Sequence, residues 1–119
     1  MKRKALMAVI VGVIMMLIMV VSSCDLFETK GKIYVRNAST YTVDATISVS
    51  IRQQGGSFST PYILSRNNTV YWELDPGNYD IRVIDGAGTS YIYPSSTWIT
   101  LIAGQERRFR FTGNSITTD

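Results

Sequence analysis

Few side chains in this sequence are able to do covalent or acid–base chemistry. The chain has one cysteine, Cys24, and nine carboxylates, and it has no histidine. Nucleophilic triads need an imidazole or an equivalent base, and transition-metal sites need imidazole or thiolate ligands. A metal would therefore have to be held by oxygen ligands. The composition predicts no metal, no cofactor and no catalytic residues.

Five carboxylates are candidates for acid–base catalysis or oxygen ligation: Asp44, Glu73, Asp75, Asp80 and Asp85. Asp44, Glu73 and Asp80 fall on the polar side of alternating segments, which favours cross-strand ion pairs over a catalytic pair. Asp75 has the position of an aspartate that starts a turn, and the segment after Asp85 lacks EF-hand spacing. We therefore expect that the protein is not an enzyme.

Four tyrosines are candidates for a binding face: Tyr34, Tyr71, Tyr91 and Tyr93. Each is predicted to fall out of phase with the apolar positions of its strand, and so on the exposed side. Exposed tyrosines stack on sugars and anchor protein partners. Cross-strand aromatic pairs that only stabilise a sheet produce the same pattern, and both interpretations stay open.

The first 23 residues differ in composition from the rest. Lys2, Arg3 and Lys4 precede an apolar run over residues 5–21 and two serines, which is the order of a secretion signal. A transmembrane helix is the alternative, but it needs about 20 apolar residues and this run is slightly shorter. The three cations also account for the whole net charge of +3, since nine basic and nine acidic residues follow. We therefore expect no nucleic-acid partner.

The end of this run resembles the lipobox of bacterial lipoproteins. The matching residues are Val21-Ser22-Ser23-Cys24. The resemblance implies cleavage before Cys24, a diacylglyceryl thioether on its sulfur, and a further acyl chain such as palmitate on the new amino group. Two or three acyl chains hold a protein firmly on a bilayer. The implied organisation is a signal peptide over residues 1–23, a short lipidated tether over 24–31, and lipid anchoring in the bacterial cell envelope, with the leaflet left open.

From residue 32 onward the hydrophobic pattern has a period of two. In residues 43–51 every odd position is apolar and every even position is polar, as in a strand with one buried face. Similar runs cover residues 33–36, 70–74, 79–83, 97–102 and 107–111, with weaker ones over 58–64 and 90–93. They predict an all-β fold, an antiparallel two-sheet Greek-key sandwich of about seven strands over residues 32–113, preceded by the signal helix. Residues 114–119 are expected to be a flexible tail.

The apolar phase of these strands also predicts the core. Glycine-containing and polar turn segments separate the strands at residues 53–57, 75–78, 85–88 and 103–105. The inward side chains are expected to be Ile33, Val35, Val43, Ala45, Ile47, Val49, Ile51, Val70, Trp72, Leu74, Tyr79, Ile81, Val83, Ile99, Leu101, Phe109 and Phe111. This set is large enough for a thin core between two sheets.

One stretch resembles a recurring hairpin of small Greek-key sandwiches, namely the transthyretin-like, carboxypeptidase regulatory-like and PEGA-type domains. It covers residues 72–83, and the matching residues are Leu74, Pro76, Gly77 and Tyr79. Residues 101–111 resemble the last hairpin of the same domains. These families share an architecture of accessory and binding domains, so the resemblance implies a fold and little function.

These observations lead to one expected function and two alternatives. We expect a lipid-anchored envelope protein whose sandwich is a non-catalytic binding or structural module. Its partners would be the membrane, through acyl chains on Cys24, and an envelope protein or a glycan. The first alternative is a surface-exposed adhesin or glycan-binding lipoprotein that uses the tyrosines, and the second is an accessory subunit of an envelope enzyme or transport complex.

The intact mass of the protein extracted from bacterial membranes tests the anchor. We expect a mass equal to residues 24–119 plus acyl chains, and we expect the Cys24→Ala variant to keep its leader because the modified thiol is gone. An unmodified Cys24 in the unaltered chain would contradict the lipobox interpretation.

Overall fold

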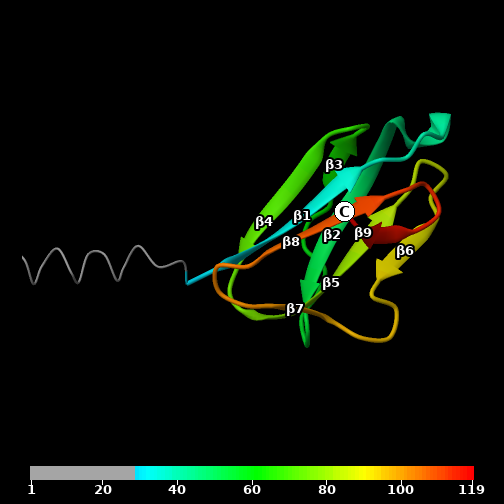
Figure 1. The fold of residues 1–119 in the computed structure, drawn as a ribbon. Helices are drawn as coiled ribbons and strands as arrows, with labels where there is room; N and C mark the ends of the chain where they lie inside the picture. The colour runs from blue at the N-terminus through cyan, green and yellow to red at the C-terminus, as the bar shows by residue number, and fades with distance from the viewer. Residues whose placement is uncertain (1–28) are drawn as a thin grey trace, which may run out of the picture.

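A computed structural model describes residues 29–119, which form a two-layered β-sandwich (Figure 1). The predicted signal helix and Cys24 lie outside the described residues. The strands are β1 (Gly31–Asn37), β2 (Thr46–Gln53), β3 (Tyr62–Ser65), β4 (Thr69–Leu74), β5 (Gly77–Ile84), β6 (Ser90–Tyr93), β7 (Ile99–Leu101), β8 (Glu106–Phe111) and β9 (Ile116–Thr118), and a short 3-10 helix, η1 (Thr42–Ala45), precedes β2. The all-β class predicted from the sequence is confirmed.

The chain forms two sheets that we call the β1 sheet and the β2 sheet. The β1 sheet has the strand order β4-β1-β8-β9, and the β2 sheet has the order β3-β2-β5-β6, with β7 also paired to β5. Every pairing is antiparallel as expected except one, since β1 and β8 run parallel. Parallel neighbours cannot be joined by a tight hairpin and need a long connection, and here the chain passes through β2–β7 between β1 and β8.

The segment 114–119 is not the flexible tail that the sequence predicts. Strand β9 pairs with β8 in the register Phe111↔Ile116, and Ile116 is only 7% exposed. Gly113 turns the chain with a φ of 105°, and the N–H of Thr112 donates to the carbonyl of Ser115. A single apolar residue among polar ones gives no periodicity, so the sequence pattern did not reveal this strand.

The predicted core is largely confirmed, with two errors. Val43 is 60% exposed and Ala45 is also exposed, because Thr42–Ala45 forms η1 and not the first part of β2. Leu64 and Ile116 are core residues that the pattern missed. The alternating pattern of residues 43–51 therefore belongs to a strand only from Thr46 onward.

A buried polar cluster explains why the chain departs from the strand at this point. Asn37, Ser39 and Asp44 are at most 1% exposed. The Ser39 hydroxyl donates to Asp44 Oδ2 at 2.6 Å, the Gly86 N–H donates to Asp44 Oδ1 at 3.0 Å, and Asn37 Nδ2 donates to the Asp44 carbonyl at 2.9 Å. The bonds join the end of β1, η1 and the β5–β6 turn. A buried carboxylate is tolerated only with such partners.

The segment around Pro76 is not a hairpin, because it connects the two sheets. Strand β4 belongs to the β1 sheet and β5 to the β2 sheet. The Tyr79 hydroxyl donates to the carbonyl of Asp75 at 2.6 Å, and the Tyr79 ring is 4% exposed. A tyrosine that bonds back to the backbone at a crossing between sheets is the tyrosine corner of β-sandwiches. Residues 101–111 likewise connect different sheets, through β7 and β8.

The tyrosine corner predicts a defined loss of stability. Tyr79→Phe keeps the buried ring and removes only the hydroxyl, so we expect the free energy of unfolding to fall by about 1 kcal/mol. Tyr71→Phe is the matched control, since its hydroxyl lies on an exposed strand position, and it should change stability by less than about 0.5 kcal/mol. Urea denaturation of both variants measures the difference. Equal stabilities would mean that the corner bond contributes nothing.

Candidate functional site

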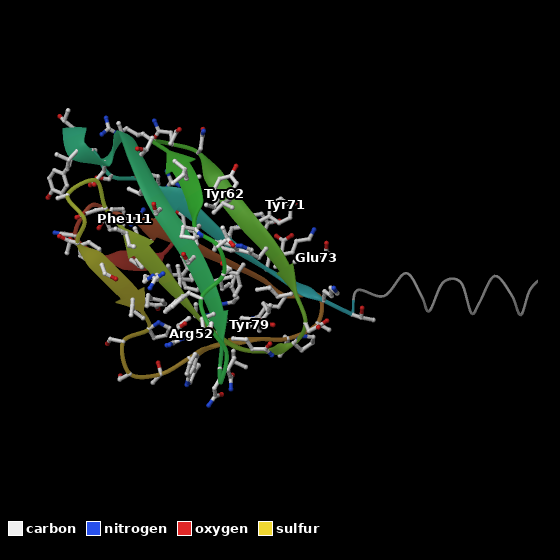
Figure 2. All side chains as sticks on the ribbon, turned by 180° about the vertical axis from the view of Figure 1, so that it is seen from behind. Arg52, Tyr62, Tyr71, Glu73, Tyr79 and Phe111 are labelled. Atoms are coloured by element: carbon white, nitrogen blue, oxygen red, sulfur yellow. The ribbon has the colours of Figure 1, made fainter. Side chains whose placement is uncertain are left out.

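Two of the four candidate tyrosines stack on the outer face of the β1 sheet. Tyr34 on β1 lies opposite Tyr71 on β4, and their ring centroids are 5.3 Å apart with an interplanar angle of 29°. The neighbours Ile33 and Val35 point into the core, so both tyrosines must point outward. Tyr71 is 56% exposed, and Figure 2 shows it on β4 beside Glu73.

Cations flank this aromatic pair. The Arg108 guanidinium on β8 lies 4.0 Å from the centroid of the Tyr34 ring, and the Lys32 ammonium lies 5.9 Å from that of Tyr71. The Tyr34 hydroxyl donates to Glu106 at 3.3 Å. Cations over ring faces are attracted by the ring quadrupole. The outer face of β4, β1 and β8 thus presents a flat aromatic platform bordered by charges of both signs.

Tyr91 and Tyr93 do not belong to this face, which corrects the four-tyrosine prediction. They lie on β6 in the β2 sheet, opposite the inward residues Val83 and Ile81. Tyr91 packs against Phe111 with centroids 5.2 Å apart, and Tyr93 lies 5.3 Å from Phe109. Burial, followed by the charge of Asp85, raises the pKa of Tyr91. These two rings therefore help to fill the core.

Hydrogen bonds or an ion pair hold three of the five candidate carboxylates, Asp44, Asp80 and Asp85. Asp80 forms a cross-strand ion pair, the kind of contact expected of it, but its partner is Arg52 of β2 and its side chain is only 4% exposed, where a solvated position was expected. Asp44 instead accepts hydrogen bonds from uncharged groups, so its predicted position on a solvated face was wrong. Asp85 accepts bonds from backbone N–H groups within its own turn. Among residues 29–119, no three carboxylate, histidine or cysteine side chains gather as a metal site would require.

The sequence pattern did not reveal a second cluster, on the outer face of the β2 sheet. The Arg52 guanidinium lies between two rings, 4.5 Å from the centroid of Phe58 and 5.4 Å from that of Trp98. Arg82 also lies over Phe58, at 4.3 Å. Phe58 and Trp98 come from the β2–β3 and β6–β7 loops. The loop that begins at Arg52 and contains Phe58 is a possible contact site from the sequence alone, but a flexible hairpin tip is the favoured interpretation.

The structure thus defines a small all-β sandwich domain. No protein-family model matches the sequence, and no curated protein does either. The solved structures that are similar to the chain include the following two. The C-terminal domain of AlgF from P. aeruginosa has a TM-score of 0.50 and 15% identity, with 77% of this chain and 96% of that one covered. A protein from Eubacterium rectale has a TM-score of 0.52 and 11% identity, with coverage of 76% and 88%.

These likenesses extend to the fold alone, because both identities are low. They support the β-sandwich that the sequence patterns predict. In the part of the chain that the structure describes, no helix has the length and apolarity needed to cross a bilayer.

The chain's last residue is tied to the same outer face as the tyrosine pair. Arg36 on β1 donates to both carboxylate oxygens of Asp119, at 3.0 and 2.9 Å, and the Asp119 N–H donates to the Arg108 carbonyl. The hydrogen bond from Arg36 lowers the pKa of the Asp119 side chain, and Arg110 lowers it further. This contact fastens β9 to the platform's edge.

Acid should weaken this contact. Because the folded state lowers the pKa of Asp119, the pair stabilises the fold at pH values above the pKa of an unfolded aspartate, and the stabilisation is lost as the pH falls through the lowered pKa. In Arg36→Gln, an NMR titration of the Asp119 side chain should give a higher pKa than in the unaltered chain. Arg107→Gln is the control and should leave it unchanged. The same pKa in Arg36→Gln and the unaltered chain would show that Arg36 does not set it.

Proposed function

We propose that the chain is a lipid-anchored protein of the bacterial cell envelope and that its sandwich is a non-catalytic binding module. The observation that carries the proposal is the Tyr34–Tyr71 stack on the outer face of the β1 sheet, in which Tyr71 is 56% exposed. The partner it binds is an envelope protein or a glycan. The lipobox resemblance at Cys24 supplies the anchor.

The chemistry of the platform favours recognition over a purely structural role. Tyrosine offers a large, rigid contact area with a polar tip, and it is enriched at binding hot spots. Arg108 and Lys32 lie near the two rings and remain solvent-accessible, so they can contact a partner's polar groups. If the tyrosine pair only stabilised the sheet, cations beside the two rings would not be needed.

The anchor orients the platform beside the membrane. Strand β1 begins seven residues after Cys24, a reach of about 25 Å when fully extended. The Gly104 N–H donates to the Lys30 carbonyl, so the β7–β8 turn lies where the chain enters the sandwich (Figure 1). Ile102 in that turn is 59% exposed. The end of the sandwich that carries the β7–β8 turn faces the bilayer, and β1 extends away from the membrane. The tyrosine platform likewise extends away from the membrane surface and is accessible to a partner.

A surface adhesin is the second candidate, and the same platform favours it. It differs from the first in the origin of its partner, which belongs to another cell or to a matrix. Only Tyr34 and Tyr71 of the four predicted tyrosines remain available for it, because Tyr91 and Tyr93 pack into the core.

Paired substitutions test the platform. Tyr71→Ala should weaken binding to envelope fragments of the host bacterium at least tenfold, about 1.4 kcal/mol, because it removes the exposed half of the stack. Tyr62→Ala is the matched control, since Tyr62 on β3 is 52% exposed against 56% for Tyr71, and it should bind as the unaltered chain does. Cosedimentation with washed fragments measures both, with circular dichroism to check the fold. Equal loss in the two variants would rule out a specific role for the platform.

A further inference from the structure

A hollow of about 540 Å³ lies on the outer face of the β2 sheet, on the side of the sandwich opposite the tyrosine platform. Its walls come from strands β2, β5 and β6 and from the β6–β7 loop. Arg52 forms part of it, and Figure 2 shows this residue in the view from behind. The volume lies within the range of small-molecule sites in proteins, about 300–1,000 Å³.

The charged groups in this hollow cancel each other. Among residues 29–119, only Arg52 and Asp80 are ionisable residues that line it, and they form a bidentate pair at 3.1 and 2.5 Å. A carboxylate has about four acceptor positions and a guanidinium has five N–H donors. Asp80 is almost fully buried and both of its oxygens are bonded to Arg52, so the pair, whose net charge is zero, offers a ligand the remaining N–H donors of Arg52.

The remaining lining is an aromatic ring and a set of hydroxyls. Trp98 is half-buried and lines the hollow beside Arg52. Ser90, Ser95, Ser96 and Thr97 contribute hydroxyl groups around it. A sugar ring presents an apolar C–H face, which packs on an aromatic ring, and hydroxyls at its edge, which pair with planar bidentate groups. We infer that this hollow binds a neutral saccharide, stacked on Trp98 and hydrogen-bonded to Arg52, which Asp80 holds in place.

The site is rigid, and it is open to a chain of sugars. Arg52 is held by Asp80 and by the two rings near it, so little side-chain freedom is lost on binding.

A second hollow of about 500 Å³ shares Ser90, Ile92 and residues 94–96 with the first and continues to β9. An oligosaccharide can thus run around the β6 edge. The inference does not depend on the anchor or on the tyrosine platform.

Tryptophan fluorescence tests the proposal on the full chain. The protein has two tryptophans, so Trp72→Phe leaves Trp98 as the only reporter. The protein, in a detergent without a sugar headgroup, is titrated with neutral oligosaccharides of glucose, galactose, mannose and N-acetylglucosamine. The charged probes are glucuronic acid, glucosamine and an uncapped peptide of serine and glycine. We expect saturable quenching by at least one neutral oligosaccharide and at least tenfold weaker binding of every charged probe.

Three variants locate the binding, which is followed by NMR of backbone amides and calorimetry. Trp98→Ala should weaken it at least tenfold. Ser96→Arg blocks the hollow from an exposed position, so it should weaken binding to the same extent without disturbing the core. Tyr62→Ala changes an exposed residue of β3 that does not line the hollow, so it should bind as the unaltered chain does. No saturable response to any neutral saccharide, tighter binding of a charged sugar or the peptide, or unchanged affinity in Ser96→Arg would each overturn the proposal.

Discussion

The buried carboxylate of Asp44 is the constraint on which one end of the sandwich depends. It draws together the end of β1, helix η1 and the β5–β6 turn through bonds from Ser39 and Gly86. The fit is close, since a Cβ on Gly86 would lie 1.5 Å from the Val43 carbonyl oxygen. A buried anion without these donors would be strongly unfavourable, so the three segments have to fold together. The opposite end is set by the Tyr79 corner, close to where β1 pairs with Leu74.

Because these interactions fix both ends of the sandwich, the side chains on its two outer faces can differ. The β1 sheet presents tyrosines and charges that compensate one another, whereas the β2 sheet presents Arg52 under two loops. A core of buried residues such as Ile33 and Ile81 separates the faces. A ligand on one side therefore meets no residue of the other site, and changes on the two faces should be energetically additive.

The sequence predicted most strands and most of the core, because a period of two shows which residues share a face. It did not show which sheet a strand joins, so the parallel β1–β8 pair and the crossings after β4 and β7 were not foreseen. In β6, tyrosines alternate with an isoleucine, and the pattern does not show which of the two residue types points into the core. In the structure Tyr91 and Tyr93 are half-buried against the core, and Ile92 is 45% exposed. The burial of Asp44 depends on a turn 42 residues away, which local periodicity does not reveal.

The same limit applies to the Arg52 cluster, and it explains why this cluster suits a binding site. Its parts come from two neighbouring strands and two loops, and only the folded register places Arg52 opposite Asp80. Asp80 is 3% exposed, so it requires a charged partner, and that requirement holds Arg52 in one orientation between Phe58 and Trp98. The ion pair that the buried Asp80 requires therefore orients these polar groups before a ligand binds. Preorganised groups of this kind lose little entropy on binding, so even a shallow hollow can discriminate among ligands.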